Sequence, residues 1–152
     1  MNHPKYHFPG TATIDMVVLP HEVDQDGTGL YSDSALELVK ELRSLEIQAQ
    51  YQHPQDSRTW IGERGFAAIA FDWILGVASN AGWAALCLLL RHKGKASVRI
   101  KLARCTQSAS QTVWEWLEVE GDGTSVANAL ERIGFTEALE SRNEEETDPA
   151  NQ

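Results

Sequence analysis

Cysteine is scarce in this sequence, and the two cysteines present, Cys87 and Cys105, do not have the spacing of a metal-binding or redox motif. Cys87 lies in an apolar segment, where a free buried thiol is common. Residues 1–10 lack the apolar stretch that a secretory signal needs. These absences predict reduced cysteines and a cytoplasmic protein.

Recognisable catalytic and metal-binding motifs are also missing. The five histidines are scattered through predicted termini and loops and do not form the paired ligands of a helical metal site. They are His3, His7, His21, His53 and His92. No order of Cys, His and Asp suggests a catalytic triad. We therefore predict no catalytic residues, no metal ligands and no cofactor, which favours a non-enzymatic protein.

Length and composition indicate one globular domain. Of 152 residues, 42% are hydrophobic and 23% are charged, which are ordinary values. The net charge of −9 argues against a general nucleic-acid binder. No acidic residue falls between Trp73 and Trp114, whereas six cations do: Arg91, Lys93, Lys95, Arg99, Lys101 and Arg104.

The segment from Gly65 to Leu90 is a long apolar run that contains Asp72. Its length meets the roughly 20 residues of a membrane span, and basic residues follow it. An ionised carboxylate inside a span costs several kcal/mol, however, and strands are predicted on both sides. We therefore expect a long central helix buried in the domain, with membrane contact through residues 66–90 as the less favoured alternative.

Within this predicted helix, four residues recur at helical spacing and form a less apolar stripe: Asp72, Gly76, Ser79 and Trp83. We interpret the stripe as a packing seam at the polar margin of the helix. Small residues along it predict packing on a second copy of the chain if the monomer does not cover them.

Periodicity, capping residues and turn residues predict the other elements. The strands are Thr11 to Leu19, Glu46 to Gln52, Ser97 to Cys105 and Val113 to Glu120, and the helices are Ser34 to Leu45 and Ser125 to Ile133. With the central helix, the order β-α-β-α-β-β-α predicts a single α/β domain with a mixed four-stranded sheet. We expect an N-terminal arm at 1–10, the domain at 11–135 and an acidic, disordered tail at 136–152.

Two loops resemble ligand-binding motifs. Asp24, Asp26 and Thr28 alternate as in a calcium loop, but the twelfth position is Ala35 instead of the required Glu, which favours a plain Asx turn. The turn from Gly121 to Thr124 precedes a helix and offers a place for a phosphate, although no phosphate-binding fingerprint completes it.

A basic strip on the third strand is the candidate surface for a partner or an anion, with Arg99, Lys101, Arg104 and Trp116 as its residues. A symmetric hairpin places Arg99 opposite Glu118 and Lys101 opposite Trp116. The strip is then either neutralised by its own cross-strand neighbours or open to an anionic partner.

The order of elements, with the helix ALELVKELRSL, the hairpin strand WEWLEVEGDG and the helix ANALERI, resembles the effector-associated constant component family of bacterial conflict systems. The resemblance implies an accessory, protein-binding role in defence signalling. Our leading hypothesis is accordingly a non-enzymatic adaptor that binds a protein partner or a second copy of itself. The alternatives are a small nucleotide- or anion-binding protein or enzyme that uses the Gly121 to Thr124 turn, and a membrane-associated protein.

Overall fold

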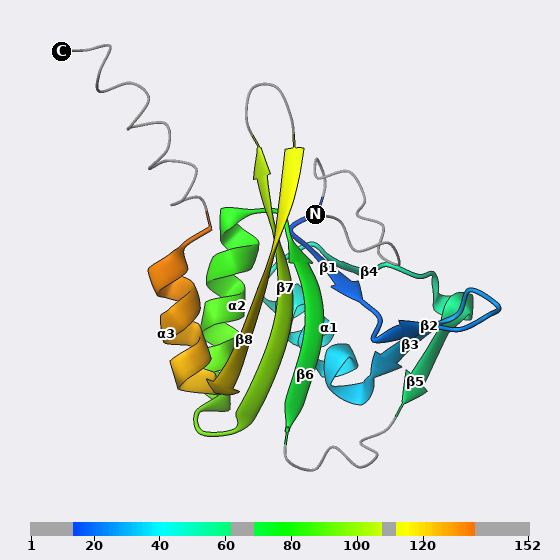
Figure 1. Ribbon diagram of the computed structural model, residues 1–152, viewed down its shortest axis with the longest axis horizontal. Coiled ribbons are helices and arrows are strands. Elements are labelled where there is room, and N and C mark those ends of the chain that lie inside the picture. The colour runs from blue at the N-terminus through cyan, green and yellow to red at the C-terminus, as the bar shows by residue number, and fades with distance from the viewer. Residues whose placement is uncertain (1–13, 62–68, 108–111, 136–152) are drawn as a thin grey trace.

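The computed structural model describes residues 14–61, 69–107 and 112–135, and Figure 1 shows their arrangement. The main sheet has five strands in the order β4-β1-β6-β7-β8. They are β1 (Met16–Leu19), β4 (Ala49–Tyr51), β6 (Phe71–Val77), β7 (Ser97–Gln107) and β8 (Thr112–Asp122). The pairs β1–β4 and β6–β7 are parallel, and the pairs β1–β6 and β7–β8 are antiparallel. The prediction of a mixed α/β fold is confirmed, but the predicted number of four strands is wrong.

The fifth strand comes from the long apolar run, which is not one helix. Its first part is the central strand β6, and its second part is the helix α2 (Asn80–Lys93). Trp73, Leu75 and Val77 point into the main core, while Ile74 is buried on the opposite face with Val17 and Leu19 of β1. A strand buried on both faces has no polar alternation, so its sequence resembles that of a buried helix.

No helix within the described residues is long and apolar enough to cross a bilayer.

The change from strand to helix is fixed by hydrogen bonds around Asp15. Its backbone carbonyl accepts the N–H of Ala78 at 2.8 Å, and its Oδ1 accepts the Ser79 hydroxyl at 2.6 Å. Ser79 in turn caps α2, because its Oγ accepts the N–H of Gly82 at 3.0 Å. The other carboxylate oxygen of Asp15 accepts the N–H of Gln48 at 2.8 Å, immediately before β4.

All three helices contribute to one core on one face of the main sheet. They are α1 (Asp33–Ser44), α2 and α3 (Gly123–Ile133), and Figure 1 shows α2 and α3 side by side along β7 and β8. The predicted helices at Ser34 to Leu45 and Ser125 to Ile133 correspond to α1 and α3. Ser32 holds the N-cap position of α1 and makes no side-chain cap hydrogen bond, so the helix begins one residue before the predicted Ser34.

A second, three-stranded sheet was not predicted from the sequence. Its order is β2-β3-β5, formed by β2 (Glu22–Val23), β3 (Gly29–Ser32) and β5 (Arg58–Ile61), and the short 3₁₀ helix η1 (Gln55–Ser57) precedes β5. The hairpin between β2 and β3 closes on Asp24, whose Oδ1 accepts the N–H groups of Asp26 and Thr28 at 2.9 Å each. These bonds confirm the favoured Asx turn.

The register of the β7–β8 hairpin differs from the predicted one. Arg99 lies opposite Glu120, and Lys101 lies opposite Glu118. The strands continue to the pair Gln107–Thr112, so the centre of the turn lies one residue further along the chain than the prediction placed it. A shift of two residues in the pairing keeps each side chain on its predicted face.

The contact between α3 and the end of α2 leaves no room at Gly123. A Cβ atom there would lie 2.8 Å from Cβ of Lys93 and still closer to the carbonyl oxygen of Leu90. We expect Gly123→Ala to lower the free energy of unfolding by about 1–3 kcal/mol through overpacking. The matched control is Gly121→Ala, whose Cβ would meet Val126 at 3.7 Å, an ordinary contact. Equal melting temperatures for the two variants would contradict this packing.

Candidate functional site

A hollow of about 340 Å³ lies between α1, the edge strand β4, and β5. We call it the cationic pocket, because Lys40, Arg43 and Arg58 line it together with the rings of Tyr51 and Trp60. The remaining lining residues are Leu36, Val39 and Gln55.

Local structure explains why these residues meet. Leu36, Lys40 and Arg43 stand at i, i+4 and i+7 on α1, so they share one stripe of the helix beside its core-facing leucines. Arg58 and Trp60 are two residues apart on β5, and strand geometry therefore places them on the same face.

The aromatic rings form a packed floor for the pocket. The ring centroids of Tyr31 and Tyr51 are 5.4 Å apart, and Trp60 lies 5.7 Å from Tyr31 and 5.5 Å from Tyr51. The Arg58 guanidinium lies 4.2 Å from the centroid of the Tyr51 ring, a cation–π contact. These contacts hold Arg58 and Trp60 in place without a carboxylate.

All the charged residues that line the pocket are positive. No carboxylate is among its lining residues, and the four ion pairs found within the described parts of the chain use other cations. Arg43 donates from Nε and Nη2 to the carbonyl oxygen of Ala49, at 3.3 and 3.1 Å. That oxygen is neutral, so the charge of Arg43 remains uncompensated.

Two polar atoms at the pocket are buried without a hydrogen-bond partner: Nε of Arg58 and the hydroxyl of Tyr51. Burial raises the pKa of Tyr51, although the nearby Arg58 and Arg43 act in the opposite direction. The hydroxyl therefore stays protonated and remains a donor. A buried unsatisfied donor costs about 1–3 kcal/mol, which an acceptor placed in the pocket would offset.

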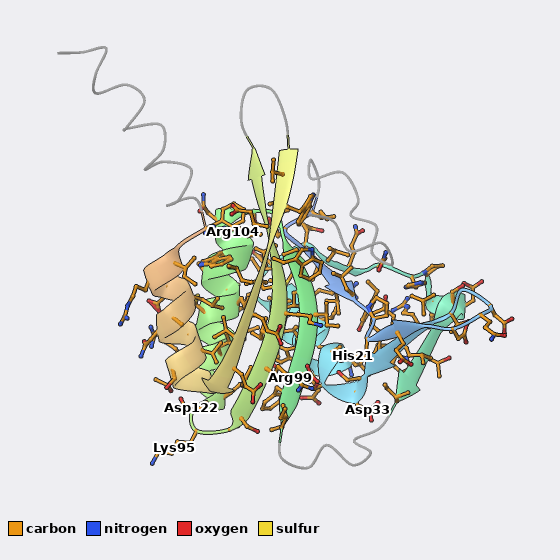
Figure 2. The ribbon with its side chains drawn as sticks, in the orientation of Figure 1. His21, Asp33, Lys95, Arg99, Arg104 and Asp122 are labelled. Atoms are coloured by element: carbon orange, nitrogen blue, oxygen red, sulfur yellow. The ribbon has the colours of Figure 1, made fainter. Side chains whose placement is uncertain are left out.

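A second hollow, about 410 Å³ in volume, lies where β6 meets the small sheet. Figure 2 shows His21, Asp33 and Arg99 around it. Its arginine is already paired, because Nη2 of Arg99 lies 2.6 Å from Oδ2 of Asp72. The Ser32 and Ser34 hydroxyls are 3.1 Å apart, and His21 Nε2 lies 3.0 Å from the carbonyl oxygen of Asp72. The second hollow is lined by charges of both signs, and its arginine is already paired, so it is a weaker anion site than the cationic pocket.

The structure does not gather the predicted basic strip into one surface. Arg99 pairs with Asp72, and Lys101 faces Glu118 across the hairpin. Arg104 is only 3% exposed and donates to the carbonyl oxygen of Gly134 at 2.6 Å. Figure 2 shows it at the opposite end of the sheet from Arg99. Trp116 packs on the face of the sheet away from the helices.

The predicted helical seam is wrong, because its four residues do not share a helix. Asp72 and Gly76 lie on β6, Ser79 is the N-cap of α2, and Trp83 lies within α2. Trp83 is buried and donates from Nε1 to the carbonyl oxygen of Leu130 at 3.1 Å. The structural reason is that the run is a strand up to Val77 and becomes a helix only after Ala78 and Ser79, which are both hydrogen-bonded to Asp15.

At the Gly121 to Thr124 turn, the backbone donors already have partners. Gly123 donates to Ala96 at 3.0 Å, and Thr124 donates to Gly94 at 3.1 Å. Asp122 caps α3, with Oδ1 accepting the N–H of Ser125 at 2.8 Å, and this bond is the main cause of its lowered pKa. A phosphate would have to displace the Asp122 carboxylate and these carbonyl oxygens.

Among residues 14–61, 69–107 and 112–135, no three His, Cys, Asp or Glu side chains lie together in a way that could hold a metal ion.

No protein-family model, curated protein sequence or solved structure matched the chain.

The sequence carried a weak signal for the cationic pocket. Lys40 and Arg43 share the polar side of an amphipathic helix, and the run Arg58 to Ile61 contains three residue types common in strands. No strand was predicted over this short run.

His53 does not line the pocket but packs against Tyr31, and it resists protonation. Burial, followed by the nearby Arg58, lowers the pKa of His53, whose Nδ1 lies 3.1 Å from the Tyr31 hydroxyl. Burial also raises the pKa of Tyr31 to about 12.

The unfolded chain therefore binds a proton at His53 at a higher pH than the folded chain does. We expect stability to fall as the pH drops below about 6.5, and to level off below the folded pKa. His53→Gln should show a smaller loss over that range in urea unfolding experiments. Identical pH dependence of the wild type and the variant would contradict this assignment.

Proposed function

We propose that this chain is a non-enzymatic interaction module whose cationic pocket receives an acidic segment of a partner protein. The observation that carries the proposal is the pocket itself: three uncompensated cations and two aromatic rings around one hollow, with no carboxylate in its lining. The resemblance to the effector-associated constant component family would place such a partner in a bacterial defence system.

The composition of the pocket suits a protein partner. Arginine, tyrosine and tryptophan are the residues enriched at the energetic centres of protein interfaces. Trp60 is 36% exposed and Leu36 is 38% exposed, so apolar surface borders the charges. An acidic side chain next to an apolar one would match this pattern.

Charge also favours an acidic partner segment over a nucleic acid. The whole chain carries a net charge of −9, which repels a long polyanion, whereas the pocket offers positive charge over a short distance. A short acidic segment needs only that local field. The partnered amides at the start of α3 leave the nucleotide-binding alternative with less support.

The test is a binding titration with a synthetic glutamate-rich peptide, measured by calorimetry at low and moderate salt. We expect wild-type binding that weakens as salt is added, because the contacts are charged. Arg58→Gln and Lys40→Gln should each weaken binding by about fivefold, equivalent to roughly 1 kcal/mol.

Lys101→Gln is the matched control, because Lys101 is a cation that lies away from the pocket and faces Glu118. It should leave the affinity unchanged. No binding by the wild type, or equal weakening by all three variants, would contradict the proposed function.

A further inference from the structure

The strand β5 forms one edge of the small sheet. Its partner is β3, and the order β2-β3-β5 leaves its other edge without a strand in the described parts of the chain. Figure 1 shows β5 at the rim of the molecule. Such an edge presents backbone donors and acceptors to which another extended chain can pair.

The same strand forms one wall of the cationic pocket. Arg58 and Trp60 line the pocket, whereas Ile61 lines the second hollow on the other side of the small sheet. One four-residue segment therefore offers both the backbone edge and one of the three pocket cations, Arg58.

We infer that the acidic segment binds as an added strand along β5, an inference that rests on the proposed function. Backbone hydrogen bonds to the β5 edge would supply affinity, and the pocket would select side chains. Successive side chains of a strand alternate between faces, so every second residue, roughly 7 Å apart, would project toward the pocket. The motif that fits is an extended segment with acidic residues at alternate positions.

The positive charge of Arg58 determines which kind of strand can pair with the β5 edge. Arg58 opposes pairing of this edge with a second copy of itself, because two such edges would bring like charges together. An acidic strand instead places a carboxylate near the guanidinium, where Nε is buried without a partner. The edge is thus protected against self-association and open to an acidic partner.

Amide hydrogen exchange on the full chain tests this binding mode. The probe is a short acetylated peptide of alternating glutamate and threonine, at saturating concentration. We expect outward-facing amides of β5 to exchange about tenfold more slowly when the peptide is bound. Amides of β8, an edge strand of the main sheet that does not line the pocket, serve as the internal control and should not change.

A second peptide of the same sequence, with N-methyl groups on alternate backbone nitrogens, removes the donors that an added strand uses. We expect it to bind at least about tenfold more weakly. Equal affinity of the two peptides, or binding without slower exchange in β5, would overturn the added-strand inference and leave the proposed function standing. Absence of binding by both peptides would overturn the proposed function as well.

Discussion

The hydrogen bonds of Asp15 are the constraint on which the rest of the structure depends. One residue joins three segments, because its carbonyl binds the end of β6, its Oδ1 binds the cap of α2, and its Oδ2 binds the start of β4. The close fit extends to Gly82, where a Cβ atom would lie 2.7 Å from the Asp15 carbonyl oxygen. Together with the Ser79 cap, this junction fixes the point at which the apolar segment changes from strand to helix after Val77.

The same junction determines where the cationic pocket forms. The bond from Gln48 to Asp15 positions β4 beside β1, and β4 presents both Tyr51 and the Ala49 carbonyl oxygen. That oxygen orients Arg43 of α1, and the Tyr51 ring supports Arg58 of β5. The pocket is therefore a product of the tertiary fold, since its cations come from two distant segments and meet only through β4.

Part of this architecture was predictable from sequence, for physical reasons that differ between elements. α1 and α3 have a clear amphipathic period, and Val98, Ile100 and Leu102 of β7 alternate with charged residues, so these elements were predicted. Arg104 is the exception, because it was grouped with Arg99 but lies on the other face of β7. β6 is buried on both faces, so its sequence does not alternate between apolar and polar residues. The run was therefore predicted to be a helix, and the seam through Asp72 was inferred from that helix. The small sheet depends on pairing between β3 and β5, which are separated by α1 and β4, and its strands are too short to show a pattern.

The basic strip of the third strand is not one open surface, because Arg99 and Arg104 have intramolecular partners. Arg99 lies beside Asp72 on the neighbouring strand, a pairing that could be expected only after β6 was known to be a strand. Arg104 lies on the helix-facing side of β7 and is used to bind the end of α3. Arg43 and Arg58 of the pocket have a backbone carbonyl and an aromatic ring as neighbours instead of a carboxylate.

The central claim is that the cationic pocket binds carboxylates, and the side-chain Nε–H resonance of Arg58 reports on it most directly. During titration with a glutamate-rich peptide, the account predicts a saturable shift of this resonance, with a midpoint equal to the calorimetric Kd. The Nε–H resonance of Arg99, whose guanidinium is held by Asp72, should stay in place. A stationary Arg58 resonance at peptide saturation, or equal shifts of both arginines, would contradict the claim.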